Sequence, residues 1–222
     1  SNDVVLLMPG EYHLTDPYIQ ALVDNSASQR DGVTFLGVPG QTVLDFTYDF
    51  EVKVFTASTF SDRITGLIFD GLTFLNAGLT VQYSTGARIT NTVFDGYSGK
   101  AMPAGAGRVA NFWRNPSAEF TNNYFRWDST SKNIDAIGVG GSNNGLVADN
   151  HVEGRLRKAI QLWSYDGMIA RGNRVERWSE TPGPGGELED HGIYVHDSSN
   201  VLVESNYMRG WSDTASGQGL KL

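Results

Sequence analysis

The chain repeats one short pattern over most of its length. Each copy has alternating apolar residues, then a polar turn, and then a further apolar residue. The copies align at residues 87–94, 118–125, 145–152, 168–175 and 201–208, with a weaker earlier copy at 68–74. One aligned turn position is occupied by Asn123, Asn150, Asn173 and Asn206. Repetition at intervals of about 20 to 50 residues is typical of solenoids, so it limits the possible folds more than any other feature of the sequence.

A second strand pattern precedes most of these turns. Its copies lie at 78–82, 109–113, 136–140, 159–163 and 192–196. Apolar residues occur there at every second position, as Ile160 and Leu162 do, which indicates half-buried strands. Strands this short and regular stack as coils, each burying its apolar face on the next. The sequence therefore predicts an all-β fold, a parallel β-helix; a β-sandwich is the alternative, but sandwiches do not keep such a register.

Local signals place the other elements within one domain. The aligned asparagines suit a ladder in which side-chain amides bond from coil to coil at a tight bend. Residues 16–26 are predicted to form a short N-terminal helix, with Asp16 as its cap and Pro17 near its start. We predict a single domain over residues 1–222. Residues 219–222 resemble the beginning of another strand, so we expect the natural protein to continue beyond them.

Composition argues against several classes of protein. A formal net charge of -8 gives no broad attraction to nucleic acid or to an anionic membrane surface. No apolar run approaches the roughly 20 residues of a membrane-spanning helix. The chain has no cysteine, so it forms no disulfide or thiolate metal site. Its four histidines make no closely spaced metal-binding pair.

A candidate binding face follows from the register of the strands. Two Gly/Pro-rich insertions, 96–107 and 179–189, lie before the strands of their coils, and such loops often flank the binding face of a solenoid. The residue two places before the first inward apolar residue of each strand is polar or ionisable. If the strands stack about 4.8 Å apart, these residues would form one row. That row is Arg108, Asp135, Lys158, His191 and Gln218. Outward strand positions add Asn111, Trp113, Gln161, Trp163, Tyr194, His196 and Lys221.

Such a face offers cations for a carboxylated chain and flat aromatic rings for sugars. An acidic protein with a cationic stripe fits a repeating anionic polymer as its ligand. Two plainer interpretations stay open: the charges are those of any solvated solenoid face, and Trp113 and Trp163 pack beneath the loops.

The coil pattern, the aligned asparagines and the strand HGIYV at 191–195 resemble the pectin-lyase-like superfamily of right-handed parallel β-helices. The resemblance covers most of the chain from about Ile64 onward and is specific for the fold. It implies a secreted, periplasmic or cell-surface protein that acts on a polysaccharide, at the outer face of its first sheet. Pectate and alginate lyases, mannuronan epimerases, polygalacturonases and phage tailspikes belong to that superfamily.

Comparison with two of its subfamilies narrows the chemistry. Residues 133–135 and 190–192 resemble two polygalacturonase motifs, but Arg157 and Lys158 stand where those hydrolases have a double aspartate. Inverting hydrolysis needs two carboxylates, so this departure argues against it. The D-P-H motif of mannuronan epimerases is absent, and residues 189–191 are only a loose match. Epimerisation therefore ranks below β-elimination.

The resemblance thus implies a lyase acting on a uronic-acid polymer such as alginate or pectate. Elimination needs a base at C5, a cation on the carboxylate and an acid for the leaving oxygen. We expect Lys158 or His191 as the base, Arg157 or Arg108 beside the carboxylate, and Tyr194 as the acid, with His196 as a competitor. Substrate contacts are expected from Arg108, Asp135, Trp113, Trp163, Gln161, His196 and Lys221. Calcium is a possible cofactor, held by Glu189 and Asp190. A polygalacturonase-like hydrolase and a non-catalytic carbohydrate-binding solenoid are the alternatives.

Overall fold

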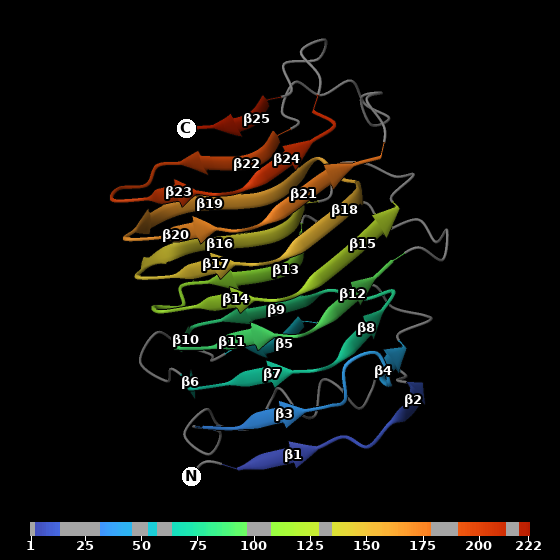
Figure 1. The fold of residues 1–222 in the computed structure, drawn as a ribbon. Helices are drawn as coiled ribbons and strands as arrows, with labels where there is room; N and C mark the ends of the chain where they lie inside the picture. The colour runs from blue at the N-terminus through green and yellow to red at the C-terminus, as the bar shows by residue number, and fades with distance from the viewer. Residues whose placement is uncertain are drawn as a thin grey trace.

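The computed structural model describes residues 3–13, 32–45, 53–56, 64–96, 108–128, 135–178, 191–211 and 218–222. Within them the regular secondary structure is entirely β, in three long parallel sheets that form the sides of a stacked coil (Figure 1). The predicted all-β parallel β-helix is confirmed. The helix expected at 16–26 and nearly all of the insertions 96–107 and 179–189 lie outside the described residues. None of the described residues belongs to a helix that could span a membrane.

Each complete coil contributes one strand to each sheet. Sheet A consists of β1 (Val4–Leu6), β3 (Thr34–Leu36), β7 (Ile68–Asp70), β11 (Arg88–Thr90), β14 (Glu119–Thr121), β17 (Leu146–Ala148), β20 (Ile169–Arg171) and β23 (Leu202–Glu204). Sheet B consists of β2 (Gly10–His13), β4 (Thr42–Asp45), β8 (Thr73–Leu75), β12 (Val93–Asp95), β15 (Tyr124–Asp128), β18 (His151–Arg155), β21 (Arg174–Arg177) and β24 (Tyr207–Arg209). Sheet C consists of β5 (Lys53–Thr56), β9 (Leu79–Gln82), β13 (Arg108–Trp113), β16 (Asp135–Asn143), β19 (Lys158–Asp166), β22 (His191–His196) and β25 (Gln218–Lys221). The short strands β6 (Ile64–Thr65) and β10 (Ser84–Thr85) pair with each other.

Inward side chains of equivalent strands stack on one another to form the core. Phe74, Phe94 and Phe125 lie in register on β8, β12 and β15, with ring centroids 5.2 and 4.7 Å apart and planes 8° apart. Burying a side chain of this size stabilises the fold by about 1.5–3 kcal/mol. Because every coil repeats the same contact, the apolar alternation in the sequence is enough to fix which face points inward.

The asparagine ladder occupies the bend between sheets A and B. Asn123 Nδ2 donates to Asn150 Oδ1 (3.0 Å), Asn150 Nδ2 to Asn173 Oδ1 (2.9 Å), and Asn173 Nδ2 to Asn206 Oδ1 (2.8 Å). Each Nδ2 also donates to a backbone carbonyl of the preceding coil, as Asn150 does to Phe120 at 3.0 Å. The predicted ladder is confirmed, and it satisfies buried amides that would otherwise destabilise the bend.

Candidate functional site

The register of sheet C brings the predicted row together. Arg108 pairs with Asp135, Asp135 with Lys158, Lys158 with His191, and His191 with Gln218. The row is nevertheless mostly buried: Asp135, Lys158 and His191 expose 0%, 2% and 1% of their surface. Arg108 is half-buried and reaches the outer face of the sheet. The sequence therefore predicts the alignment of these residues correctly, but it does not show their burial.

The outward positions form two more rows beside the first. One row is Asn111, Gly138, Gln161, Tyr194 and Lys221. The other is Trp113, Gly140, Trp163 and His196. The predicted contact residues of β13, β19, β22 and β25 are thus neighbours on the outer side of sheet C, which we call the sheet C face, but Gln161 and Trp163 are themselves buried, with 6% and 9% of their surface exposed.

Two glycines on β16 shape this face. A Cβ on Gly138 would lie 2.1 Å from Cδ of Arg108, and a Cβ on Gly140 would lie 2.1 Å from Cε2 of Trp163. Because these positions carry no side chain, Trp113 and Trp163 stack across the glycine rung with centroids 5.5 Å apart and planes 15° apart. Arg108 Cζ lies 4.0 Å from the Trp163 ring centroid. The glycines at positions 138 and 140 of the sequence were the signal that Trp113, Trp163 and Arg108 pack closely here. This packing was not predicted from the sequence.

A chain of hydrogen bonds crosses the sheet C face and fixes a histidine tautomer. Arg108 Nη2 donates to Gln161 Oε1 at 2.9 Å. An arginine can only donate, so this oxygen is the acceptor and the Gln161 amide nitrogen is free to donate. That nitrogen lies 3.1 Å from His196 Nε2, which must then accept. The proton of neutral His196 is consequently assigned to Nδ1, which lies 3.1 Å from Asp197 Oδ2.

Tyr194 lies between two ammonium groups at the next position of this face. Lys158 Nζ is 4.8 Å and Lys221 Nζ 5.1 Å from the centroid of its ring. His196 stacks on the same ring at 4.8 Å, and the His191 ring lies 5.1 Å away at a tilt of 46°. Cations over an aromatic face are attracted by about 0.5–2 kcal/mol, more when they are desolvated. Four of the predicted site residues therefore surround a single tyrosine.

Asp135 and Arg157 form a bidentate ion pair at the edge of the face. Arg157 Nε and Nη2 each donate at 2.9 Å to the two carboxylate oxygens of Asp135. The Asp135 side chain is fully buried and that of Arg157 is 20% exposed. Burial lowers the pKa of nearby Arg108 from its usual range, although the charge of Asp135 opposes that shift. Arg157, expected beside a substrate carboxylate, is thus already engaged with a carboxylate of the protein.

The remaining predicted residues fall elsewhere. Glu189 and Asp190, the expected calcium ligands, lie outside the described residues. Charged residues on or beside this face include Arg108, Arg157, Lys158, Lys221, Asp135 and Asp197. Aromatic rings lie close to three of these cations, Arg108, Lys158 and Lys221.

This chain belongs to the family of right-handed β-helix proteins, because the family model described as "Right handed beta helix region" matches residues 55–220. The family match supplies the handedness of the coil predicted from the sequence. A search of curated proteins gave no match.

Solved structures were also compared with this chain. PfbA, a surface adhesin of Streptococcus pneumoniae, is similar with a TM-score of 0.60 and 14% identity, over 97% of this chain and 50% of that one. DFA-IIIase from Arthrobacter chlorophenolicus A6 has a TM-score of 0.46 and 15% identity, over 93% of this chain and 58% of that one. The A-module of the mannuronan C-5 epimerase AlgE6 from Azotobacter vinelandii has a TM-score of 0.33 and 18% identity, over 93% of this chain and 59% of that one. The chain thus spans between half and three fifths of these structures, and the likeness to PfbA, at 14% identity, shows the fold alone.

Proposed function

We propose that this chain is a polysaccharide lyase that binds a uronate-containing polymer along the sheet C face and cleaves it by β-elimination. The observation that carries the proposal is the cationic and aromatic surface around Tyr194, which lies between Lys158 and Lys221 and stacks on His196. The half-buried Trp113 extends this surface, and the buried Trp163 supports it by stacking on Trp113 beside Arg108. A polymer of this kind lies outside the cell, so the proposal includes secretion or attachment to the cell surface.

The chemistry assigns a role to each group. A base removes the C5 proton, the C4–O bond breaks as a C4–C5 double bond forms, and an acid gives a proton to the leaving oxygen. His196 Nε2 carries the lone pair that a base needs, once the amide of Gln161 turns away. The Tyr194 hydroxyl is the acid, and Lys221 and Arg108 neutralise the carboxylate. Lys158 and His191 were expected as bases, but their burial favours supporting roles beneath Tyr194.

The test is an incubation with alginate, pectate and glycosaminoglycans, with and without calcium, while ultraviolet absorbance reports unsaturated uronate ends. We expect product from at least one polymer, and a rate at least about 100-fold lower for Tyr194→Phe and His196→Ala, as for loss of a general acid or base. His13→Ala, near the N-terminal end of sheet B, is the matched control and should keep full activity. Absence of absorbance on every polymer would contradict the lyase proposal, and reducing sugar released without absorbance would indicate a hydrolase.

A non-catalytic carbohydrate-binding solenoid is the second candidate. The burial of Lys158 and His191 and the ion pair between Arg157 and Asp135 favour it, because three predicted catalytic residues are then structural. In that case a polymer would bind without turnover. Trp163→Ala and Arg108→Gln would weaken the binding measured by calorimetry, while no product would form with the unaltered chain.

A further inference from the structure

A like-charge step interrupts an otherwise alternating row of charges on the outer face of sheet B. Strand register aligns Asp95, Arg126, Glu153, Glu176 and Arg209 on β12, β15, β18, β21 and β24. The signs alternate except between Glu153 and Glu176, which are directly opposite each other. Two carboxylates in that position repel and destabilise the strand pair unless a cation lies between them.

His151 lies at this step. Its Nε2 is 3.2 Å from Glu176 Oε2 and 3.9 Å from Glu153 Oε2, and one ligand atom from each of the three residues fits within 4.8 Å of the others. Tetrahedral coordination with bonds of about 2.1 Å places ligand atoms about 3.4 Å apart. The measured separations of 3.2 and 3.9 Å lie on either side of that value. The side chains of His151, Glu153 and Glu176 are 37%, 21% and 17% exposed, so the position between them is open to solvent on one side.

Hydrogen bonds orient both carboxylates, and that of Glu153 is held on the side away from His151. The Tyr124 hydroxyl donates to Glu153 Oε1, the oxygen that does not face His151. Metal-binding carboxylates are oriented by outer hydrogen bonds like the one from Tyr124. Arg174 Nε and Nη2 donate to Oε2 and Oε1 of Glu176 at 2.8 and 3.0 Å, so this arginine competes with an ion for the Glu176 carboxylate.

We propose that His151, Glu153 and Glu176 bind a divalent transition-metal ion of the zinc class. One imidazole and two carboxylates suit such an ion better than calcium or magnesium, which prefer oxygen ligands alone. The ion would remove the repulsion between the two glutamates and connect β18 to β21. Its site is on a different sheet from the proposed polysaccharide face and does not depend on it.

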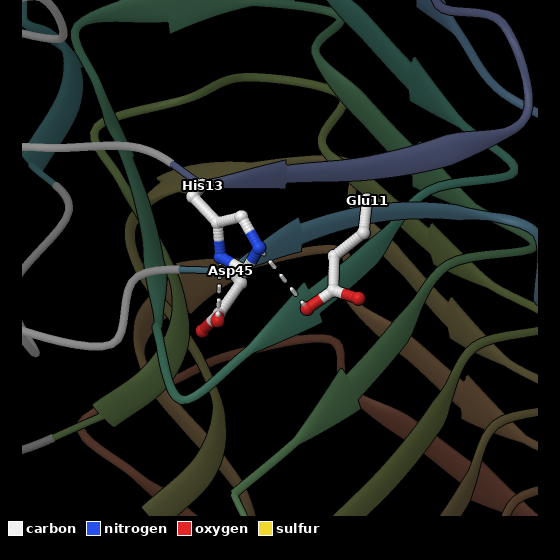
Figure 2. A group of neighbouring side chains, drawn as sticks. All are labelled: Glu11, His13 and Asp45. Atoms are coloured by element: carbon white, nitrogen blue, oxygen red, sulfur yellow. Dashed lines mark hydrogen bonds and ion pairs between the residues drawn. The ribbon is translucent and has the colours of Figure 1, made fainter.

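A second group of one histidine and two carboxylates shows which geometry such a site needs. Figure 2 shows His13 between Glu11 and Asp45, near the N-terminal end of sheet B. There Nε2 of the ring is 3.7 Å from Glu11 and Nδ1 is 3.2 Å from Asp45, so the carboxylates face different ring nitrogens. A single ion can take one of these nitrogens only. In the group around His151 both carboxylates face the same nitrogen, which is the geometry of a shared ion.

Titration of the metal-free chain with Zn²⁺, followed by calorimetry, and with Co²⁺, followed by its visible spectrum, tests the proposal. We expect one ion per chain, and at least about 50-fold weaker binding for His151→Ala. Tyr124→Phe should weaken binding about tenfold, since it removes an outer hydrogen bond without removing a ligand. Arg174→Gln should tighten binding, because a competing cation leaves Glu176. Zinc should also raise the unfolding midpoint, and a chelator should reverse this.

The matched control is His13→Ala, which removes the other histidine of sheet B that faces two carboxylates. It should leave the stoichiometry and affinity unchanged. Equal affinity in His151→Ala and the unaltered chain would overturn the proposal, as would loss of binding in His13→Ala alone. Circular dichroism of each variant separates loss of the ligand from loss of the fold. Lyase activity is not part of the readout, so failure here leaves the proposed function standing.

Discussion

The bend between sheets A and B and the sheet C face are built on the same repeat but use it in opposite ways. At the bend, one position is asparagine in four successive coils, and each amide bonds to the next. On the sheet C face, one register row reads Asn111, Gly138, Gln161, Tyr194 and Lys221, with a different residue on every coil. Both rows are aligned equally well by the backbone, so the contrast comes from the side chains alone.

The difference separates stability from function. A repeated residue gives each coil the same contact with its neighbour, which adds stability in proportion to the number of coils. A row of unlike residues gains nothing from repetition, and its members contact one another only through specific pairs such as Arg108 with Gln161. We therefore expect changes at the bend to alter the free energy of unfolding, and changes on the sheet C face to alter ligand binding.

The largest effect is expected from Asn150→Ala at the centre of the ladder. The change removes the amide that donates to Phe120 and Asn173, leaves the backbone N–H of Asn123 without its acceptor, and leaves Asn123 Nδ2 with the Ile89 carbonyl alone. Buried polar groups left without partners cost about 1–3 kcal/mol each, so we expect a loss of about 3 kcal/mol in the free energy of unfolding. Urea denaturation measures it. Asn206→Ala, at the less buried end of the ladder, should cost less, and equal losses would contradict the ladder's cumulative role.

Gly140→Ala is expected to have the second-largest effect and to act on both properties. The added methyl group would meet the Trp163 ring and force it from its stack on Trp113. Overpacking of this kind costs about 1–3 kcal/mol, and displacement of the ring should weaken polysaccharide binding about tenfold. Tryptophan fluorescence and calorimetry measure the two changes. Gly219→Ala is the control, because its Cβ would make only ordinary contacts of 3.8 Å with Met208.

Lys221→Gln should change binding alone. The ammonium group lies 5.1 Å from the Tyr194 ring on the most C-terminal strand of the face. We expect about fivefold weaker binding of a uronate polymer at low salt, with the difference vanishing near 1 M salt, where charges are screened within about 3 Å. Arg171→Gln, an exposed cation of sheet A, is the control. A loss that persists at high salt would show that Lys221 acts through packing rather than charge.

The fold was predictable because its information is periodic. The alternation at Ile160 and Leu162 sets the inward face, and the aligned asparagines locate one bend. The same periodicity predicted that Arg108, Asp135, Lys158 and His191 share a row, since residues at equivalent positions of stacked strands must align. Both results depend on the position of a residue within its coil and not on what surrounds it.

Burial and pairing across the site were not predictable in this way. The sequence gives no sign that Asp135 takes both donors of Arg157, because the two residues are 22 positions apart and meet through a specific rotamer pair. The group around His151 was also missed: His151 and Glu153 are close in sequence, but Glu176 joins them only through the register of β18 and β21. Contacts of this kind depend on side-chain direction, which periodicity leaves open.

The smallest effect at neutral pH is expected from Tyr165→Phe. Tyr165 is a buried residue near the C-terminal end of β19, the strand that also carries Gln161 and Trp163. Its hydroxyl donates to the Asn115 carbonyl at 2.9 Å, so removing it should cost about 0.5–1 kcal/mol at pH 7. Burial raises the pKa of Tyr165 to about 12, whereas the pKa of an unfolded tyrosine is near 10. Above pH 10 the unfolded chain loses this proton first, so the stability is complete below pH 10 and falls as the pH rises toward 12. Urea denaturation at pH 8, 10 and 11 should show a shallower decline for Tyr165→Phe, and Tyr124→Phe should reduce the rest of the slope, since the pKa of Tyr124 is also raised to about 12. An unchanged slope in both variants would mean that the alkaline loss arises elsewhere and that the Tyr165 hydroxyl contributes only its hydrogen bond.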